Sequence, residues 1–355
     1  MRQASDRRRQ AEGQVDGLHR DTARREGLIA APRVRSGAAK PRSPWLVSPE
    51  NGHRHGAWAN LAAAMDVLTG PWPARASWAL LPLLVGPALG TALDDHSRAV
   101  ALTGAALAWA TWAGVLVAVL VPRTVSLTAL RIAAPAAFGA AGWAAWAGER
   151  AAVDVLAVTG ATLALVAAFS PLTGEGFVNG SAYGDERRLP LRVPGAVLFG
   201  PVVIAEIAAV TPWVAGPLLL AARQWAAGAL VLGVGGPIAG AAIRALHGLS
   251  RRWAVFVPAG MVLHDLHTMT DPVLFPRRLI GRLGPAPAAV AADTIDLTGR
   301  SLGLALELTL TEPLEVSPRR PDKSVQVVSV PRLIFTPTRP GALLAEAARR
   351  RLPVR

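Results

Sequence analysis

Apolar residues dominate the chain from about residue 76 to residue 247, and only short polar joints interrupt them. A helix needs roughly twenty apolar residues to cross a bilayer. Six blocks of about this length predict membrane-spanning helices at 77–93, 99–121, 125–147, 151–169, 195–221 and 225–246. The alternative, a buried helical core of a soluble protein, is disfavoured because so few polar residues separate the blocks. The sequence therefore predicts a mainly α-helical membrane domain.

One long polar interruption, residues 173–194, separates the fourth predicted span from the fifth. It holds the only tyrosine of the chain and a run of four charged residues. Its glycines favour a shaped turn over a passive linker. We expect this segment either to dock on the C-terminal region or to be a solvated loop. Its candidate interaction residues are Asn179, Tyr183, Asp185, Glu186, Arg187 and Arg188.

The N-terminal region lacks apolar periodicity. Residues 1–56 are polar and basic and cannot bury enough surface to offset their chain entropy, which predicts a disordered tail. This tail is either simply solvated or an arm that binds lipid headgroups or a partner. Residues 57–75 then predict a short helix at the membrane surface, followed by a linker where Pro71 and Pro73 break the helix.

The pattern changes again after residue 250, where β-branched residues alternate with polar ones. Short strands are expected at 252–257, 260–264, 273–283, 290–297, 302–309 and 325–335, with turn signals between them. An Ala/Leu/Arg helix follows at 342–352. Residues 250–355 are thus predicted to form a small β-rich domain, a barrel or a sandwich, with a C-terminal helix.

Composition and charge support a membrane protein and suggest its orientation. The chain is 52% hydrophobic and 17% charged, with a net charge of +13. Basic residues of the tail and of alternate joints fall on one side of the six predicted spans, whereas the other side has only Arg98, Arg150 and Arg223. Positive residues favour the cytoplasmic side, so we expect a cell-membrane protein with both termini and the β-rich domain in the cytoplasm. Its basic flanks are expected to face anionic lipid headgroups, and nucleic-acid binding is not expected because no binding module is recognisable.

Few residues of the predicted spans can carry chemistry. Glu206 is the only acidic residue well inside a span, and a carboxylate in lipid is costly enough to suggest a function. A structural hydrogen-bonded role and a proton or ion role both remain open for it. Arg131 and Arg244 lie near the predicted cytoplasmic ends and can reach that side. The small-residue spacings 86–90 and 236–240 predict close helix packing.

No catalytic, cofactor or metal site is predicted. The chain contains no cysteine, which excludes thiolate chemistry and disulfides. Nucleophile-elbow and phosphate-loop patterns are missing from the sequence. His264, Asp265, His267 and Asp271 have spacings that metal ligands use, but Asp before Pro is also ordinary turn chemistry.

Two resemblances add to this reading. The strand order from residue 250 onward, with its last helix, resembles the bacterial pleckstrin-homology-like domains, which are often tethered to membrane helices. That resemblance implies a binding or assembly module. The Ala-rich spans, the 176–188 loop and the tail together resemble uncharacterised multi-pass membrane proteins of GC-rich Gram-positive bacteria, which bring no established activity.

Three functional hypotheses follow from these observations. We expect a non-enzymatic scaffold that binds lipids or protein partners through its C-terminal domain. The alternative is a transporter or channel that uses Glu206. An intramembrane enzyme would need a second polar group facing Glu206, and the sequence reveals none.

Overall fold

The computed structural model describes residues 70–148, 151–319 and 327–354, and all structural statements below concern these residues. The predicted N-terminal tail and most of the predicted surface helix lie outside them. The helix that follows begins at Trp72, so Pro73 does not lie in a linker as predicted. It stands instead in the first turn, where proline's missing N–H leaves no helical hydrogen bond unmade.

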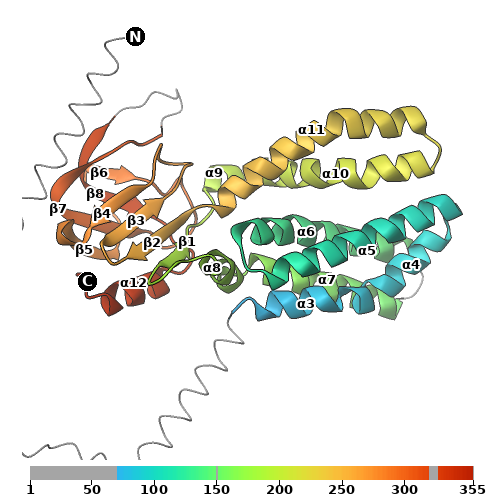
Figure 1. Cartoon of the computed structure of the whole chain (residues 1–355), viewed down its shortest axis with the longest axis horizontal. Helices are drawn as coiled ribbons and strands as arrows, with labels where there is room; N and C mark the ends of the chain where they lie inside the picture. Colours follow the sequence, from blue (N-terminus) through green and yellow to red (C-terminus); the bar gives the residue numbers. More distant parts are fainter. Residues whose placement is uncertain (1–69, 149–150, 320–326, 355) are drawn as a thin grey trace, which may run out of the picture. The chain divides into compact units, whose positions relative to one another are not determined.

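Six segments are long and apolar enough to cross a membrane, as predicted. Two of them are each built from two helices, because a short break divides them. In chain order the helices of the spans are α3 (Trp72–Leu84), α4 (Gly86–Asp94), α5 (Arg98–Leu120), α6 (Thr124–Ala147), α7 (Ala151–Phe169), α9 (Gly195–Leu198), α10 (Pro201–Ala221) and α11 (Trp225–Ser250) (Figure 1). The protein is therefore a multi-pass membrane protein.

Helices α3 to α7 share one hydrophobic cluster. Within it, the indole N–H of Trp78 donates to the backbone oxygen of Trp112 at 3.0 Å. The indole N–H of Trp112 donates in return to the oxygen of Trp78 at 3.1 Å. A buried indole N–H needs a partner, and the hydrocarbon core of a bilayer offers none, so this reciprocal pair fixes α3 against α5.

Helices α10 and α11 pack side by side as a hairpin (Figure 1). Their close contact uses glycines that the sequence did not single out, since a Cβ added at Gly216 would lie 2.5 Å from Cγ of Leu232. The predicted packing at 86–90 and 236–240 is wrong for three of its four glycines. Gly86, Gly90 and Gly240 have no heavy atom within 4 Å of an added Cβ, because those positions face outward.

The C-terminal region forms two four-stranded sheets and a final helix, which confirms the predicted β-rich domain. Its core contains the fully buried rings of Phe256, Phe275 and Phe335. The first sheet has the order β1 (Arg187–Pro190), β2 (Trp253–Val257), β3 (Gly260–His264), β4 (Val273–Pro276). The second has the order β5 (Ile280–Pro285), β7 (Leu306–Val316), β8 (Val328–Phe335), β6 (Thr294–Asp296), and the helix is α12 (Pro340–Arg349). The likeness to pleckstrin-homology-like domains stays a prediction.

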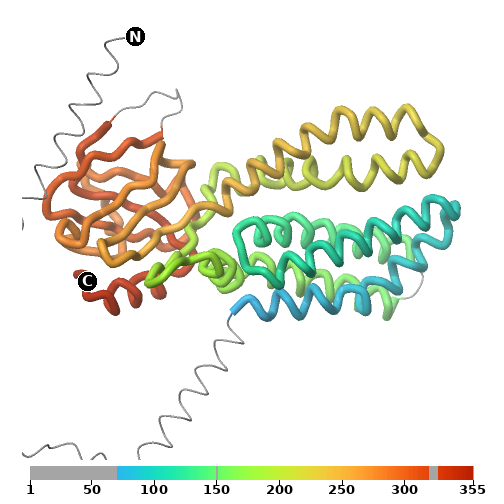
Figure 2. The backbone as a smooth tube through the Cα atoms, in the orientation of Figure 1, coloured from blue at the N-terminus to red at the C-terminus, as the bar shows by residue number. Residues whose placement is uncertain are grey.

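The polar interruption is not a loop throughout. It contains the end of helix α8 (Pro171–Asn179) and strand β1, which pairs antiparallel with β2 and places Arg188 opposite Val255. The β-rich domain therefore does not consist of residues 250–355 alone. Figure 2 traces the chain from α7 into the sheet and back into the fifth span.

The glycine contact between α10 and α11 generates a prediction. Replacing Gly216 by Ala puts a methyl group into Leu232, and overpacking of this kind costs about 1–3 kcal/mol. We expect a lower midpoint of thermal unfolding in detergent micelles. Gly233→Ala is the matched control on α11, because nothing lies within 4 Å of its added Cβ. Equal midpoints for the two variants would contradict this packing.

Candidate functional site

Helix α8 lies directly against the ends of the spans on the side of the β-domain. A Cβ added at Gly176 would lie 2.8 Å from Cδ of Pro71, just before α3. One added at Gly180 would lie 2.2 Å from the backbone oxygen of Pro122, in the joint between α5 and α6. Only glycine permits these approaches, so the glycines of the interruption bring α8 onto the membrane helices.

Strand β2 of the first sheet is buried on both of its faces. Along β2, side chains alternate, as they do in any strand. Trp253 and Val255 belong to the hydrophobic cluster of α3 to α7 and α8, together with Phe177. Ala254 and Phe256 point the other way, into the core of the β-domain. One strand thus connects the apolar core of the membrane helices with that of the β-domain.

A buried carboxylate, Glu175 on α8, adds an ionic connection. This residue is only 4% exposed. It forms one ion pair with Arg187 of β1 and a second, at 2.6 Å, with Nη1 of Arg339, the residue just before α12. The neighbouring elements α8 and β1 thus meet the start of α12, 164 positions further along the chain, at this one side chain. We call Glu175, Arg187 and Arg339 the junction.

Asn179 holds the turn that leads from α8 into β1. Its side-chain amide donates to the backbone oxygens of Glu175 at 2.8 Å and Arg188 at 2.7 Å. Its side-chain oxygen accepts from the backbone N–H of Arg188 at 2.9 Å. Arg188 pairs with Glu186 at 2.9 Å and lies over the ring of Trp253. Four of the six predicted interaction residues, Asn179, Glu186, Arg187 and Arg188, are therefore engaged in holding the segment in place.

The other two predicted interaction residues face outward beside a surface hollow. Tyr183 is 86% exposed, and Asp185 is exposed as well. The hollow has a volume of about 440 Å³ and is lined by Gly184, Asp185, Glu186, Arg187, Pro258, Arg349 and Arg350. The residues that hold this segment in place and the residues that it presents at the surface are therefore different.

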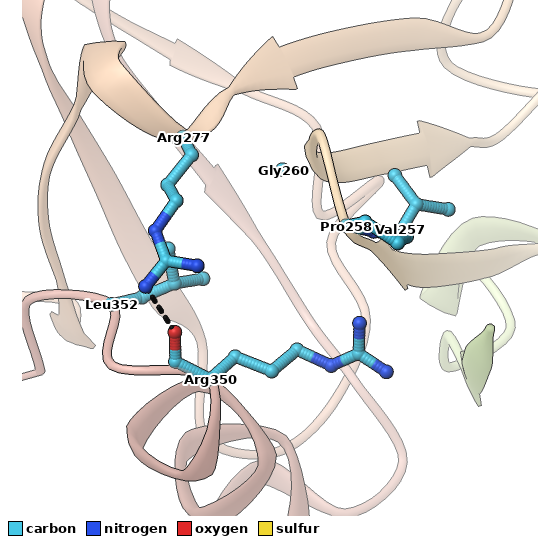
Figure 3. Close-up of a pocket in the computed structure, with 6 residues that line it drawn as sticks. All are labelled: Val257, Pro258, Gly260, Arg277, Arg350 and Leu352. Carbon is cyan, nitrogen blue, oxygen red and sulfur yellow. Dashed lines mark hydrogen bonds between the residues drawn. The ribbon is translucent and has the colours of Figure 1, made fainter. Parts of the chain in front are cut away.

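A smaller cavity of about 80 Å³ adjoins the hollow and shares Pro258 and Arg350 with it. Figure 3 shows Arg277 above it, donating a hydrogen bond of 2.6 Å to the backbone oxygen of Arg350. The side chain of Arg350 pairs with Glu346 at 2.6 Å. Through these contacts both arginines hold the end of α12.

The spacing that suggested metal ligands serves an ion pair instead. Arg252 donates two hydrogen bonds, of 2.7 and 2.6 Å, to the carboxylate of Asp265, and both side chains are buried. Asp265 also accepts from Thr268 at 2.8 Å and from the backbone N–H of His267 at 3.1 Å. Burial alone would raise the pKa of Asp265, but these hydrogen bonds and the charge of Arg252 lower it. Among the described residues no group of three metal-ligating side chains occurs.

Glu206 lies where α10 faces the other spans, and one of its carboxylate oxygens is buried without a hydrogen-bond partner among the described residues. Contrary to the sequence reading, a second polar group is near, because the charge of Arg131 on α6 acts on Glu206. The guanidinium of Arg131 lies 5.7 Å from the ring of Phe169. A hydrogen bond of 2.9 Å between Thr128 and His247 also joins α6 to α11. These polar residues form a seam between α6 and the α10–α11 hairpin.

Comparison with known proteins adds no identification. No protein-family model matches the chain, and neither does a curated protein or a solved structure. Functional conclusions therefore rest on the geometry of the junction, the hollow and the seam.

The buried ion pair generates a prediction about pH. Asp265→Asn leaves Arg252 buried without its counter-charge, and breaking such a pair costs about 3–5 kcal/mol, so we expect a lower unfolding temperature at neutral pH. Since the folded pKa of Asp265 is lowered, the wild type keeps this stabilisation above the ordinary value of 3.8 and loses it as the pH falls further. The variant should lack this acid-dependent loss. Thermal unfolding followed by circular dichroism at pH 7 and pH 3 measures both effects.

The matched control is Asp293→Asn, which breaks an exposed ion pair with Arg332 at 3.4 Å. Exposed pairs contribute about 0–1 kcal/mol, so this variant should unfold close to the wild type. Equal losses of stability in the two variants would show that the buried pair stabilises the fold no more than the exposed pair does.

Proposed function

We propose that the chain is a non-enzymatic scaffold of the cell membrane. In this proposal both termini are cytoplasmic, and the β-domain presents a protein-binding surface at a fixed height above the bilayer. The observation that carries it is β1, a strand from between two spans that completes the first sheet of the β-domain.

A β-domain that is held in a fixed position relative to the spans is suited to presenting a binding surface. A domain attached by one flexible linker moves independently of its anchor. Here the chain enters the sheet from α8, leaves it for α9 and returns from α11 into β2. The junction and the shared apolar cluster add contacts between the same two parts. Any surface on the β-domain is then held in one orientation to the spans.

Charge supports a cytoplasmic position for the β-domain. The segments on its side of the spans carry Arg123, Arg187, Arg188, Arg251 and Arg252. The described joints on the other side carry only Arg98 and Arg223. This asymmetry is the one that the positive-inside rule associates with cytoplasmic segments.

The hollow beside Tyr183 is the surface that best fits a protein partner. Tyrosine and arginine are the residue types that dominate binding energy at protein interfaces. Tyr183 and Arg349 are exposed there, whereas Arg187 and Arg188 are fixed by their ion pairs. A surface whose neighbours are already ordered loses less conformational freedom on binding.

Photocrosslinking from Tyr183 tests this proposal. We expect a photoreactive phenylalanine derivative at position 183 of the full chain to form adducts with a discrete set of proteins in intact cells. The charge reversal Arg349→Glu should reduce these adducts at equal expression, because Arg349 lines the same hollow. The same probe at Asp95, exposed in a joint on the other side, is the control. Lipid adducts alone at position 183, or an adduct profile equal to that at position 95, would overturn the proposal.

Transport is a second candidate, and the seam is the observation that favours it. A buried carboxylate oxygen without a hydrogen-bond partner, close to the charge of Arg131, has the composition of a proton or cation relay. The scaffold proposal predicts no proton or cation flux in proteoliposomes, and no difference between wild type and Glu206→Gln. Asp154→Asn, in the first turn of α7, is the control. A flux that only Glu206→Gln abolishes would replace the scaffold by a transporter.

A further inference from the structure

The loop of residues 298–304, between β6 and β7, contacts the chain where the fifth span begins. The backbone N–H of Gly195 donates to the oxygen of Gly299 at 3.2 Å. The hydroxyl of Ser301 donates to the oxygen of Val193 at 2.9 Å. An added Cβ at Gly195 would lie only 2.2 Å from the oxygen of Arg300. This loop of the β-domain is thus fixed to the first residues of α9.

The start of this span lies at the edge of the hydrocarbon. Helix α10 has 21 residues, which at a rise of 1.5 Å per residue span about 31 Å, close to the thickness of a hydrocarbon core. The preceding residues, α9 and Phe199, therefore fall at the boundary between headgroups and acyl chains. Phe199 is 77% exposed there, as a lipid-facing side chain would be.

The 298–304 loop also presents exposed apolar side chains. Leu302 is 60% exposed and Leu304 is 51% exposed. The loop nevertheless has a defined shape, since Gly299 and Arg300 both have positive φ and Oγ of Ser301 also lies 2.7 Å from the backbone oxygen of Thr298. Two exposed leucines beside an exposed arginine match the composition of segments that lie in a membrane interface.

We propose that the 298–304 loop is a membrane anchor of the β-domain, which inserts Leu302 and Leu304 into the bilayer that α10 crosses. The occupant of this surface is lipid, because the loop is fixed to the start of α9, four residues before the exposed Phe199, and its own leucines are exposed as well. The anchor goes beyond the scaffold proposal, because it needs no protein partner and lies on a different loop from Tyr183.

Spin labels on single cysteines test the anchor, and the absence of native cysteine makes such labelling specific. The variants Leu302→Cys and Leu304→Cys of the full chain are labelled and reconstituted into vesicles of phosphatidylcholine and phosphatidylglycerol. Collisions with dissolved oxygen, which partitions into lipid, are compared with collisions with a water-soluble nickel chelate. We expect oxygen to dominate at both positions, at depths of about 5–10 Å into the headgroup and acyl boundary.

Two further positions calibrate the result. Phe199→Cys is the lipid-facing reference. Ala259→Cys is the aqueous control, because it lies in the exposed turn after the five residues of β2, about 16 Å of strand beyond the end of α11. Nickel collisions at both loop positions equal to those at Ala259 would overturn the anchor. Exclusion of both reagents there would overturn it too, since that would indicate a protein cover.

Discussion

The carboxylate of Glu175 is the interaction on which the arrangement of the molecule depends. Removing a charge from water is expensive, and a buried carboxylate is stable only when its partners are in place. Glu175 is buried between an arginine of β1 and an arginine at the start of α12. Its burial therefore requires α8, the first sheet and the final helix to be assembled together. The membrane helices and the β-domain are coupled by this requirement.

Apolar packing also couples the membrane helices to the β-domain. Because alternate residues of β2 belong to two different hydrophobic clusters, the strand cannot leave one without exposing the other. Gly176 and Gly180 keep α8 against the ends of the spans. The proposed scaffold and the proposed lipid anchor both rely on this fixed position, since each needs a surface that stays at one height above the bilayer.

Much of the fold could be predicted from the sequence, because spans of twenty apolar residues and short apolar runs bounded by turn residues, such as β2 and β3, carry strong local signals. Strand β1 could not be predicted, since it has four residues and its partner lies more than sixty residues later. The proximity of the charge of Arg131 to Glu206 was missed for a similar reason. The sequence indicates how deep a residue lies in a span. Which side of a helix contacts the neighbouring helices depends on tertiary packing. The same limit explains the wrong assignment of Gly86 and Gly90 to a helix contact.

The fixed mounting of the β-domain is the central claim, and a distance distribution tests it most directly. Spin labels at Val121→Cys, in the joint between α5 and α6, and at Ala259→Cys, in the β2–β3 turn, report on the two parts of the full chain in vesicles. Pulsed electron–electron double resonance should give one narrow distribution of distances between the two labels when the chain is otherwise native. Adding Glu175→Gln should broaden it, because the junction then loses its charge. A broad distribution without that substitution would contradict the account.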